Sequence, residues 1–152
     1  MQIRNSVKAF IVKEKKLLTI KGVDHLGDYY LLPGGGQRPG ETMHQSLQRE
    51  CQEEINCRVE VMDLLFIREY IGRNHEFSEY DKDIHQIEYM FLCKLPEICS
   101  PKIGKVPDNN QVGVAWLELS NLMEYRLYPQ DMREIFSEFS SQKHKIYFGD
   151  IN

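Results

Sequence analysis

The chain has 152 residues, 41% of them hydrophobic, which is typical of one globular domain that can bury a core. Its formal net charge is −4 and it has no run of Lys and Arg, which argues against a general nucleic-acid-binding or anionic-membrane-binding protein. No apolar stretch approaches the roughly 20 residues that span a bilayer, so we expect a soluble, cytoplasmic protein.

Three strands are predicted before the first helix. Residues 7–12 and 17–20 flank a polar tetrapeptide and together predict a β-hairpin, and residues 29–32 predict a third strand. No internal repeat and no linker rich in Pro, Gly or Ser divides the chain. We therefore expect residues 1–152 to form a single α+β domain.

Residues 43–55 predict an amphipathic helix with well-defined ends. Thr42, with Gln45 three residues later, fits a capping box, and Asn56 suits the left-handed position that ends a helix. The apolar stripe has four members: Met43, Leu47, Cys51 and Ile55. An acidic face lies about a quarter-turn away at 100° per residue, so the helix can pack against a core while its acidic face borders a cleft.

Three carboxylates define that acidic face, because Glu50, Glu53 and Glu54 are one, three and four residues apart, and Arg49 lies beside Glu53. Crowded carboxylates repel one another on an isolated helix. Hard cations such as Mg²⁺ or Mn²⁺ prefer oxygen ligands and would relieve that repulsion. The pattern therefore indicates a divalent-cation site.

The second half of the chain predicts further strands and then helices. Residues 59–71 contain two β-rich stretches, residues 111–117 form the last well-supported strand, and residues 146–148 predict a short edge strand. Ser120 fits the cap of a helical turn, and Pro129 fits the first turn of a helix. Two apolar patterns support these elements. One alternates along a strand: Ile87, Tyr89, Phe91, Cys93 and Leu95. The other follows a helix: Met132, Ile135, Phe136 and Phe139.

The four cysteines are Cys51, Cys57, Cys93 and Cys99. They form no Cys-x-x-Cys pair and have no nearby histidine, so a zinc site is not expected. We expect buried, reduced thiols, and Cys51 and Cys93 fall on predicted apolar faces.

The segment 34–57 resembles the Nudix box, whose pattern is Gly, five residues, Glu, seven residues, then Arg-Glu-apolar-any-Glu-Glu-any-Gly-apolar. The matching positions are Gly35, Glu41, Arg49, Glu50, Cys51, Glu53, Glu54 and Cys57. Asn56 stands where the family usually has glycine, and Cys57 is only weakly apolar. The flanks are also similar to the family, since residues 29–36 resemble its strand and glycine-rich loop, and residues 114–117 resemble its late strand.

The resemblance implies a Nudix fold, with a mixed β-sheet sandwiched between α-helices, and metal-dependent hydrolysis of a diphosphate bond. It also implies that Mg²⁺ or Mn²⁺ is bound by the Gly35 carbonyl and by carboxylates of the box: Glu50, Glu53, Glu54 and, in some members, Glu41. Arg49 is interpreted as an orienting residue, since its guanidinium can hold a carboxylate through paired hydrogen bonds.

The general base stays open at this point, because members of the family use either a box glutamate such as Glu50 or a glutamate from a later segment. The later candidates are Glu76, Glu79 and Glu88. Glu88 stands out because it is predicted on the strand face opposite Ile87 and Tyr89, where a covered carboxylate needs a partner. The alternative is a solvated strand face. Some relatives carry a metal-binding glutamate at the position of Ala115, which makes a substitute such as Glu88 more plausible.

Residues 72–83 form a polar segment in which Phe77 and Tyr80 could stack a nucleobase, while Arg73 or His75 orients ribose or phosphate. His85 and Gln86 are further candidates for the pocket. The alternatives are an ordinary surface hairpin and a structural histidine. The lysines of the loop 101–110 contact either phosphates or water, which the sequence does not decide.

The favoured substrate is a nucleoside diphosphate linked to another moiety, such as ADP-ribose or a nucleotide sugar, ahead of a nucleoside triphosphate. A non-catalytic nucleotide-sensing module is the alternative of another class. Such modules typically lose box carboxylates, whereas this chain keeps all of them, which favours an enzyme. No nucleic-acid or membrane partner is expected. Dimers are common in the family, so the choice between a monomer and a homodimer stays open.

Overall fold

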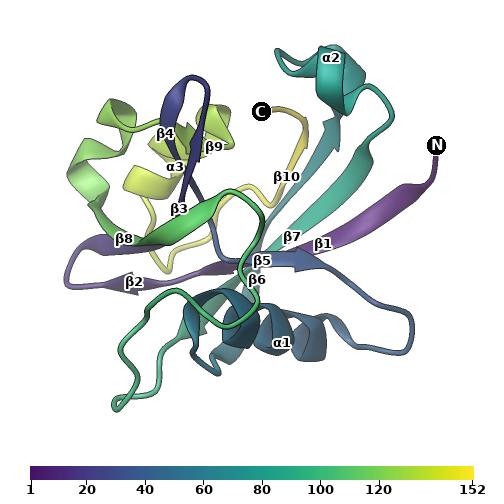
Figure 1. The fold of residues 1–152 in the computed structure, drawn as a ribbon. Coiled ribbons are helices and arrows are strands. Elements are labelled where there is room, and N and C mark those ends of the chain that lie inside the picture. Colours follow the sequence, from purple (N-terminus) through teal and green to yellow (C-terminus); the bar gives the residue numbers. More distant parts are fainter.

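The computed structural model describes residues 1–152 and contains ten strands, three α-helices and three 3₁₀ helices (Figure 1). The strands are β1 (Ile3–Phe10), β2 (Val12–Lys13), β3 (Lys16–Asp24), β4 (Gly27–Leu31), β5 (Gly34–Gly36), β6 (Glu60–Ile71), β7 (His85–Lys94), β8 (Gln111–Glu118), β9 (Leu127–Tyr128) and β10 (Tyr147–Asp150). The helices are α1 (Met43–Ile55), η1 (Gly72–Asn74), α2 (Ser78–Asp81), η2 (Leu119–Glu124), η3 (Gln130–Met132) and α3 (Arg133–Ser137). None of them has the length and hydrophobicity of a membrane-spanning helix.

The strands form two sheets, and each sheet mixes parallel and antiparallel pairs. The first has the order β10-β6-β7-β1-β5, in which β1 and β7 are parallel and β6 and β7 are antiparallel. The second has the order β2-β3-β4-β9, with β8 paired to β3. The predicted α+β class with mixed β-structure and flanking helices is confirmed, and its strands are divided between two sheets.

Two hydrophobic clusters lie on opposite faces of the first sheet. Ala9 and Phe10 are neighbours on β1, and because successive side chains alternate, Ala9 belongs to one cluster and Phe10 to the other. On the first side α1 packs its buried residues Leu47, Cys51 and Ile55. On the other side the C-terminal helices contribute buried apolar residues: Leu122, Met132 and Phe136. Helices therefore cover both faces of β1.

The helix α1 has the predicted bounds and both predicted ends. Gln45 N donates to Thr42 Oγ1 at 3.1 Å and Thr42 N donates to Gln45 Oε1 at 2.8 Å, so the capping box is complete. Asn56 ends the helix in the left-handed region, with φ 56° and ψ 35°. These ends were predictable because they depend on contacts between residues close in sequence.

Several elements differ from the sequence-based prediction. The two β-rich stretches within residues 59–71 form one strand, β6, whose pairing with β7 shifts register on both sides of Leu64. Residues 72–83, for which an ordinary surface hairpin was the alternative prediction, contain η1 and α2. The C-terminal helix is short, and Phe139 lies beyond the end of α3 but still packs on the second cluster.

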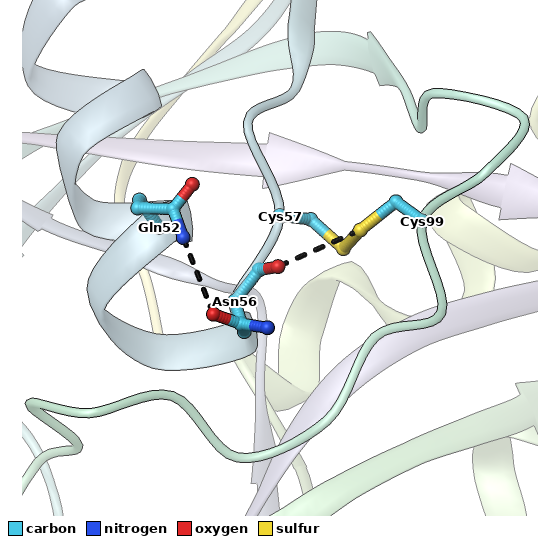
Figure 2. The surroundings of a disulfide bond; sticks show 4 residues. All are labelled: Gln52, Asn56, Cys57 and Cys99. Carbon is cyan, nitrogen blue, oxygen red and sulfur yellow. Dashed lines mark hydrogen bonds between the residues drawn. A yellow bond between two sulfur atoms is a disulfide. The ribbon is translucent and has the colours of Figure 1, made fainter.

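The prediction of four reduced thiols is wrong for two of them. Cys51 and Cys93 are buried and free, as expected. Cys57 and Cys99 instead form a disulfide, with 6.1 Å between their Cα atoms (Figure 2). They are separated by 42 residues in sequence. The spacing therefore carried no signal, because the pair forms only when the segment between β7 and β8 returns to the end of α1.

Candidate active site

The glycine-rich strand β5 brings its backbone against the acidic face of α1. It pairs with β1 so that Val7 lies opposite Gly35. A Cβ atom on Gly35 would lie 2.6 Å from the carboxyl carbon of Glu50, so no larger residue fits without displacing that carboxylate. Gly34 has φ +141°, a conformation that L residues rarely adopt, and its N–H donates to Glu54 Oε2 at 3.2 Å.

Arg49 gathers three carboxylates beside β5. Its Nε and Nη2 donate to the two oxygens of Glu41 at 2.6 and 3.0 Å, and its Nη1 donates to Glu50 Oε1 at 2.7 Å and to Glu53 Oε2 at 3.3 Å. Its Nη2 also donates to the Gly36 carbonyl oxygen at 3.1 Å. The hydrogen bond from Arg49 is the main reason why the pKa of Glu41 falls to about 2. A bidentate guanidinium–carboxylate pair is rigid, so Arg49 can orient the acidic face.

Glu54 is the most buried carboxylate of the box, with 1% of its surface exposed. Its Oε1 has no hydrogen-bond partner. Burial raises the pKa of Glu54 to about 8, Lys8 opposes that change, and the charges of Asp108 and Glu50 add to it. A buried oxygen without a partner needs compensation, and a hard cation would supply it.

The residues present fit a divalent cation, because every donor is oxygen and one buried carboxylate oxygen is unpartnered. No three Asp, Glu, His or Cys side chains are grouped as a metal cluster. In the described conformation, Glu50 and Glu53 are instead paired with Arg49.

Replacing Glu54 with Gln should stabilise the metal-free protein at neutral pH. The pKa of Glu54 is about 8 in the folded state against an ordinary value of 4.5, so folding requires this carboxyl to be protonated between those pH values. This requirement reduces the free energy of unfolding. The reduction is absent below pH 4.5, grows as the pH rises, and reaches about 3 kcal/mol at pH 7. Thermal unfolding in a chelator at pH 5 and pH 8 measures it.

The exposed Glu97→Gln serves as the control for this change. We expect the melting temperature of Glu54→Gln to exceed that of the parent by a margin that is larger at pH 8 than at pH 5. Equal melting temperatures at both pH values would contradict the raised pKa.

Glu88 lies in the interior and is only 4% exposed, so the alternative of a solvated strand face is wrong. Arg68 Nε donates to Glu88 Oε2 at 2.6 Å and Gln86 Nε2 donates to Glu88 Oε1 at 2.8 Å. Burial alone would raise the pKa of Glu88, but the charges of Arg68 and Lys8 hold it below its ordinary value. Glu88 is therefore a compensated carboxylate outside the Arg49 cluster. The other later candidates, Glu76 and Glu79, are exposed.

Lys8 connects the two groups of acids. Its Nζ lies 3.5 Å from the Gly34 carbonyl oxygen. Its charge opposes the rise in the pKa of Glu54 and helps to hold the pKa of Glu88 below its ordinary value. Lys8, Arg68 and Glu88 together border a small cavity of about 170 Å³. Lys8 and Arg68 thus supply two positive side chains to this cavity, and Lys8 also acts on Glu54 of the box.

A larger cavity of about 550 Å³ adjoins the small one, since Leu31 and Tyr128 line both. Its walls come from β4, β9, α2 and the C-terminus, and Figure 1 shows the C-terminal end of the chain between α2 and β9. Phe77 and Tyr80 lie in this wall, and the ring of Phe77 meets that of Tyr128 edge-on, with 5.6 Å between centroids. A volume of this size and an aromatic lining suit a nucleobase with its ribose.

Arg126 forms part of the same wall but is already paired. Its Nη1 donates to Asp24 Oδ1 at 2.9 Å and its Nη2 pairs with Asp24 Oδ2. The guanidinium also lies 5.5 Å from the ring centroid of Tyr29 and 5.6 Å from that of Tyr128. Because Asp24 neutralises Arg126, this wall offers aromatic and hydrogen-bonding surface rather than a free phosphate-binding cation.

Three of the predicted substrate-binding residues line neither cavity. Arg73 is exposed, and its Nη2 lies 3.6 Å from Met1 Sδ. His75 stacks on Tyr70 with 5.2 Å between ring centroids, and its Nε2 lies 2.6 Å from Asp150 Oδ1. His85 is half-buried at the start of β7, and its Nε2 has no hydrogen-bond partner. Of the predicted substrate-binding residues, only Phe77 and Tyr80 therefore line the large cavity.

Several residues that line the two cavities were not predicted from the sequence. They are Lys8, Asp24, Tyr29, Arg68, Asn110, Arg126, Tyr128 and Asn152. The pairs that build these walls are distant in sequence, since 102 residues separate Asp24 from Arg126. The one local signal was the pair of adjacent aromatic residues Tyr29 and Tyr30 on β4.

The family model for the NUDIX domain matches residues 2–139. A MutT NUDIX hydrolase from Burkholderia pseudomallei has a similar structure, with a TM-score of 0.71 at 19% identity over 92% of this chain and 100% of that one. An ADP-ribose pyrophosphatase from Streptococcus suis has a TM-score of 0.66 at 20% identity over 97% of this chain and 98% of that one. The E. coli ORF135 protein has a TM-score of 0.62 at 20% identity over 90% of this chain and 89% of that one. No curated protein matches in sequence.

Proposed function

Because the chain belongs to the NUDIX domain family, we propose that it hydrolyses a diphosphate bond in a nucleoside diphosphate linked to another moiety, with Mg²⁺ or Mn²⁺ as cofactor. Family membership and neighbours named as hydrolases and pyrophosphatases are consistent with an enzyme that acts on phosphorus anhydrides. The compounds that we favour are ADP-ribose and nucleotide sugars. One structural neighbour is itself named an ADP-ribose pyrophosphatase, and that name supports the choice.

The observation that carries this proposal combines three features at α1 and the neighbouring strand β5. Arg49 holds Glu41, Glu50 and Glu53 there, and Glu54 keeps an unpartnered buried oxygen. The small cavity, lined by Lys8 and Arg68, adjoins the large aromatic cavity, and Lys8 Nζ lies 3.5 Å from the carbonyl oxygen of Gly34 beside the box. A nucleoside in the large cavity would thus direct its phosphates towards the positive side chains of Lys8 and Arg68 and towards the box.

The proposed cation ligands are the Gly35 carbonyl and three box carboxylates: Glu50, Glu53 and Glu54. A bound cation would neutralise phosphate charge and lower the pKa of bound water. Arg49 would hold Glu50 and Glu53 in orientation, and Lys8 would meet phosphate oxygens. We assign proton abstraction to Glu50 in preference to Glu88, because both oxygens of Glu88 already accept hydrogen bonds from Arg68 and Gln86.

Phe77 and Tyr80 are proposed to contact the nucleobase. The three remaining candidates, Arg73, His75 and His85, receive at most an indirect role, because they lie outside both cavities. We further propose a single domain over residues 1–152, a cytoplasmic location and no nucleic-acid or membrane partner. Its mass in solution would distinguish a monomer from a homodimer.

Replacing Tyr80 with Ala should raise the KM by about tenfold and leave kcat nearly unchanged, because stacking on a base is worth roughly 1–3 kcal/mol. Tyr80 is 72% exposed, so its loss should not unfold the protein. Tyr147→Ala is the matched control, since Tyr147 is also exposed, at 53%, and lines neither cavity. Steady-state kinetics on the preferred substrate make the comparison. An equal effect of both changes would remove Tyr80 from the binding site.

A substrate panel tests the proposed function directly. It contains ADP-ribose, nucleotide sugars, dinucleoside polyphosphates and nucleoside triphosphates, each assayed with and without Mg²⁺ or Mn²⁺. We expect cation-dependent release of a nucleoside monophosphate from ADP-ribose or a nucleotide sugar. Preference for triphosphates would instead favour pyrophosphohydrolase activity on nucleoside triphosphates. Nucleotide binding without turnover of any member would favour a sensing module.

A further inference from the structure

The segment that joins β7 to β8 runs back along the end of α1 (Figure 1). We refer to residues 95–110 of this segment as the strap. Three strap amides donate to the last carbonyls of α1: Lys102 N to Ile55 O at 3.1 Å, Gly104 N to Glu54 O at 2.9 Å and Val106 N to Glu53 O at 3.2 Å. The last four carbonyls of a helix have no partner within the helix, so the strap supplies partners that α1 lacks.

The strap contacts the backbone of two proposed cation ligands, Glu53 and Glu54. At Gly104 the approach is so close that a Cβ atom would lie 1.9 Å from the Glu53 carbonyl oxygen. Just after the strap, the buried Gln111 donates from Nε2 to the Glu54 carbonyl oxygen at 2.9 Å. The position of the carboxylates at the end of α1 therefore depends on where the strap lies.

The Cys57–Cys99 disulfide attaches this strap to the helix (Figure 2). Cys57 comes directly after Asn56, which ends α1, and Cys99 Sγ lies 3.6 Å from the Asn56 carbonyl oxygen. Asn56 is in turn held by Gln52, whose Nε2 donates to Asn56 Oδ1 at 3.3 Å. The covalent link thus sits at the joint between the strap and the turn that ends the acidic helix.

A reductant can reach this disulfide. Both cysteines line a surface groove of about 460 Å³, and the same groove is lined by Arg58 and Lys102. Cys57 is buried, but Cys99 is partly exposed and also borders a second groove beside Trp116. Positive side chains favour the thiolate form of an incoming thiol, which is the form that attacks disulfides. In a cytoplasmic protein such a bond is usually redox-active rather than permanent.

We propose that the Cys57–Cys99 disulfide is a redox switch that controls cation binding at the carboxylates of α1 by attaching and releasing the strap. The coupling rests on the proposed function, because it assumes that Glu53 and Glu54 hold the cation. A dithiol is the chemical class of the reductant. One of its thiolates attacks the Cys99 sulfur and expels the Cys57 thiolate, which takes up a proton. The second thiol of the reductant then attacks the mixed disulfide at the reductant's own sulfur and releases Cys99 as a thiol. Two electrons have then passed to the protein, and the dithiol has become a cyclic disulfide.

Reduction has one target, because Cys51 and Cys93 are already thiols. Thiol counting in denaturant should therefore find two thiols before treatment with a dithiol and four after it. Hydrogen exchange then follows the amides of Lys102, Gly104 and Val106. We expect their exchange to become at least about tenfold faster on reduction, while the amides of β1 keep their rates. Four thiols in the untreated protein, or unchanged exchange at all three amides, would overturn the switch.

Titration with Mn²⁺ alone, without substrate, tests the coupling. The dissociation constant should rise by about tenfold on reduction, which is the loss typical when supports of metal ligands are removed. Gly104→Ala should raise it similarly in the disulfide form, because the added methyl displaces the strap. Gly113→Ala is the matched control, since a Cβ there has no atom within 4 Å. Equal Mn²⁺ affinity in both redox forms would overturn the coupling.

The two readouts separate failure of the switch from failure of the proposed function. If neither form binds Mn²⁺, the proposed cation site is wrong and the coupling falls with it, while the exchange data still decide whether the disulfide holds the strap. If Mn²⁺ binds equally well before and after a reduction that releases the strap, the cation site stands and the switch does not.

Discussion

Glu53→Gln is expected to lower turnover by about 10²- to 10⁴-fold, because a catalytic cation supplies several kcal/mol to the transition state and this change removes one of its proposed charged ligands. The amide keeps the size of the carboxylate and one oxygen that can accept the hydrogen bond now made by Arg49 Nη1. Folding should therefore be affected far less than activity. Turnover at saturating Mg²⁺, together with thermal unfolding, measures both effects.

Glu60→Gln is the matched control for this change, since Glu60 is an exposed glutamate at the start of β6 and belongs to neither cavity. It should retain parental turnover. If Glu53→Gln also retains full turnover, Glu53 is not a cation ligand in the reaction, and the proposed role of the acidic face must be given up.

Arg68→Ala should produce the largest loss of stability, about 3–5 kcal/mol, because it leaves the buried carboxylate of Glu88 without its charged partner. Arg68 also donates from Nη1 to the Ile151 carbonyl oxygen at 2.7 Å and to Asn152 Oδ1 at 3.2 Å, so the C-terminus loses an anchor too. Arg58→Ala, at an exposed arginine, is the control. Chemical denaturation at pH 7 gives the free energies of unfolding.

The pH dependence of this effect follows from the lowered pKa of Glu88. A carboxyl with a depressed folded-state pKa stabilises the protein above its unfolded pKa and loses that contribution as the pH falls through the folded value. The difference in the free energy of unfolding between the parent and Arg68→Ala should therefore become smaller as the pH falls into the acid range. A difference that stays constant down to pH 3 would contradict the ion pair as its cause.

Arg68→Met combined with Glu88→Leu separates structure from chemistry at this pair. Replacing both members of a buried ion pair with apolar residues of similar size is often neutral for stability, so the double variant should recover most of the loss. If it folds and turns over substrate normally, Glu88 has no catalytic role. If it folds but is inactive, the Arg68–Glu88 pair takes part in the reaction, and Glu88→Gln with Arg68 retained then tells whether Glu88 is the base.

Local interactions explain what was predictable in this molecule. The bounds of α1, its capping box and the left-handed Asn56 all depend on residues within four positions of one another. The pattern from Gly35 to Cys57 identified the family, which the match over residues 2–139 confirms. The burial of Leu47, Cys51 and Ile55 followed from helical periodicity in the same way.

The interior position of Glu88 was only partly predictable. Alternation along β7 placed it opposite Ile87 and Tyr89, but alternation cannot say whether a face is covered or which residue compensates a charge there. Its partner Arg68 lies 20 residues earlier, on β6, and the antiparallel register of β6 and β7 sets the two side by side. The sheet thus made an ion pair from two residues that share no local pattern.

The sequence by itself determined the acidic helix, its ends, its apolar face and the family, because short-range spacing specifies each of them. Only the tertiary structure decided that Cys99 reaches Cys57 across 42 residues and that Arg126 meets Asp24 across 102. It also decided that Phe77 and Tyr80 face a cavity while Arg73, His75 and His85 do not. The reason is that such contacts depend on the path of the chain between distant segments, and no periodicity within either segment encodes that path.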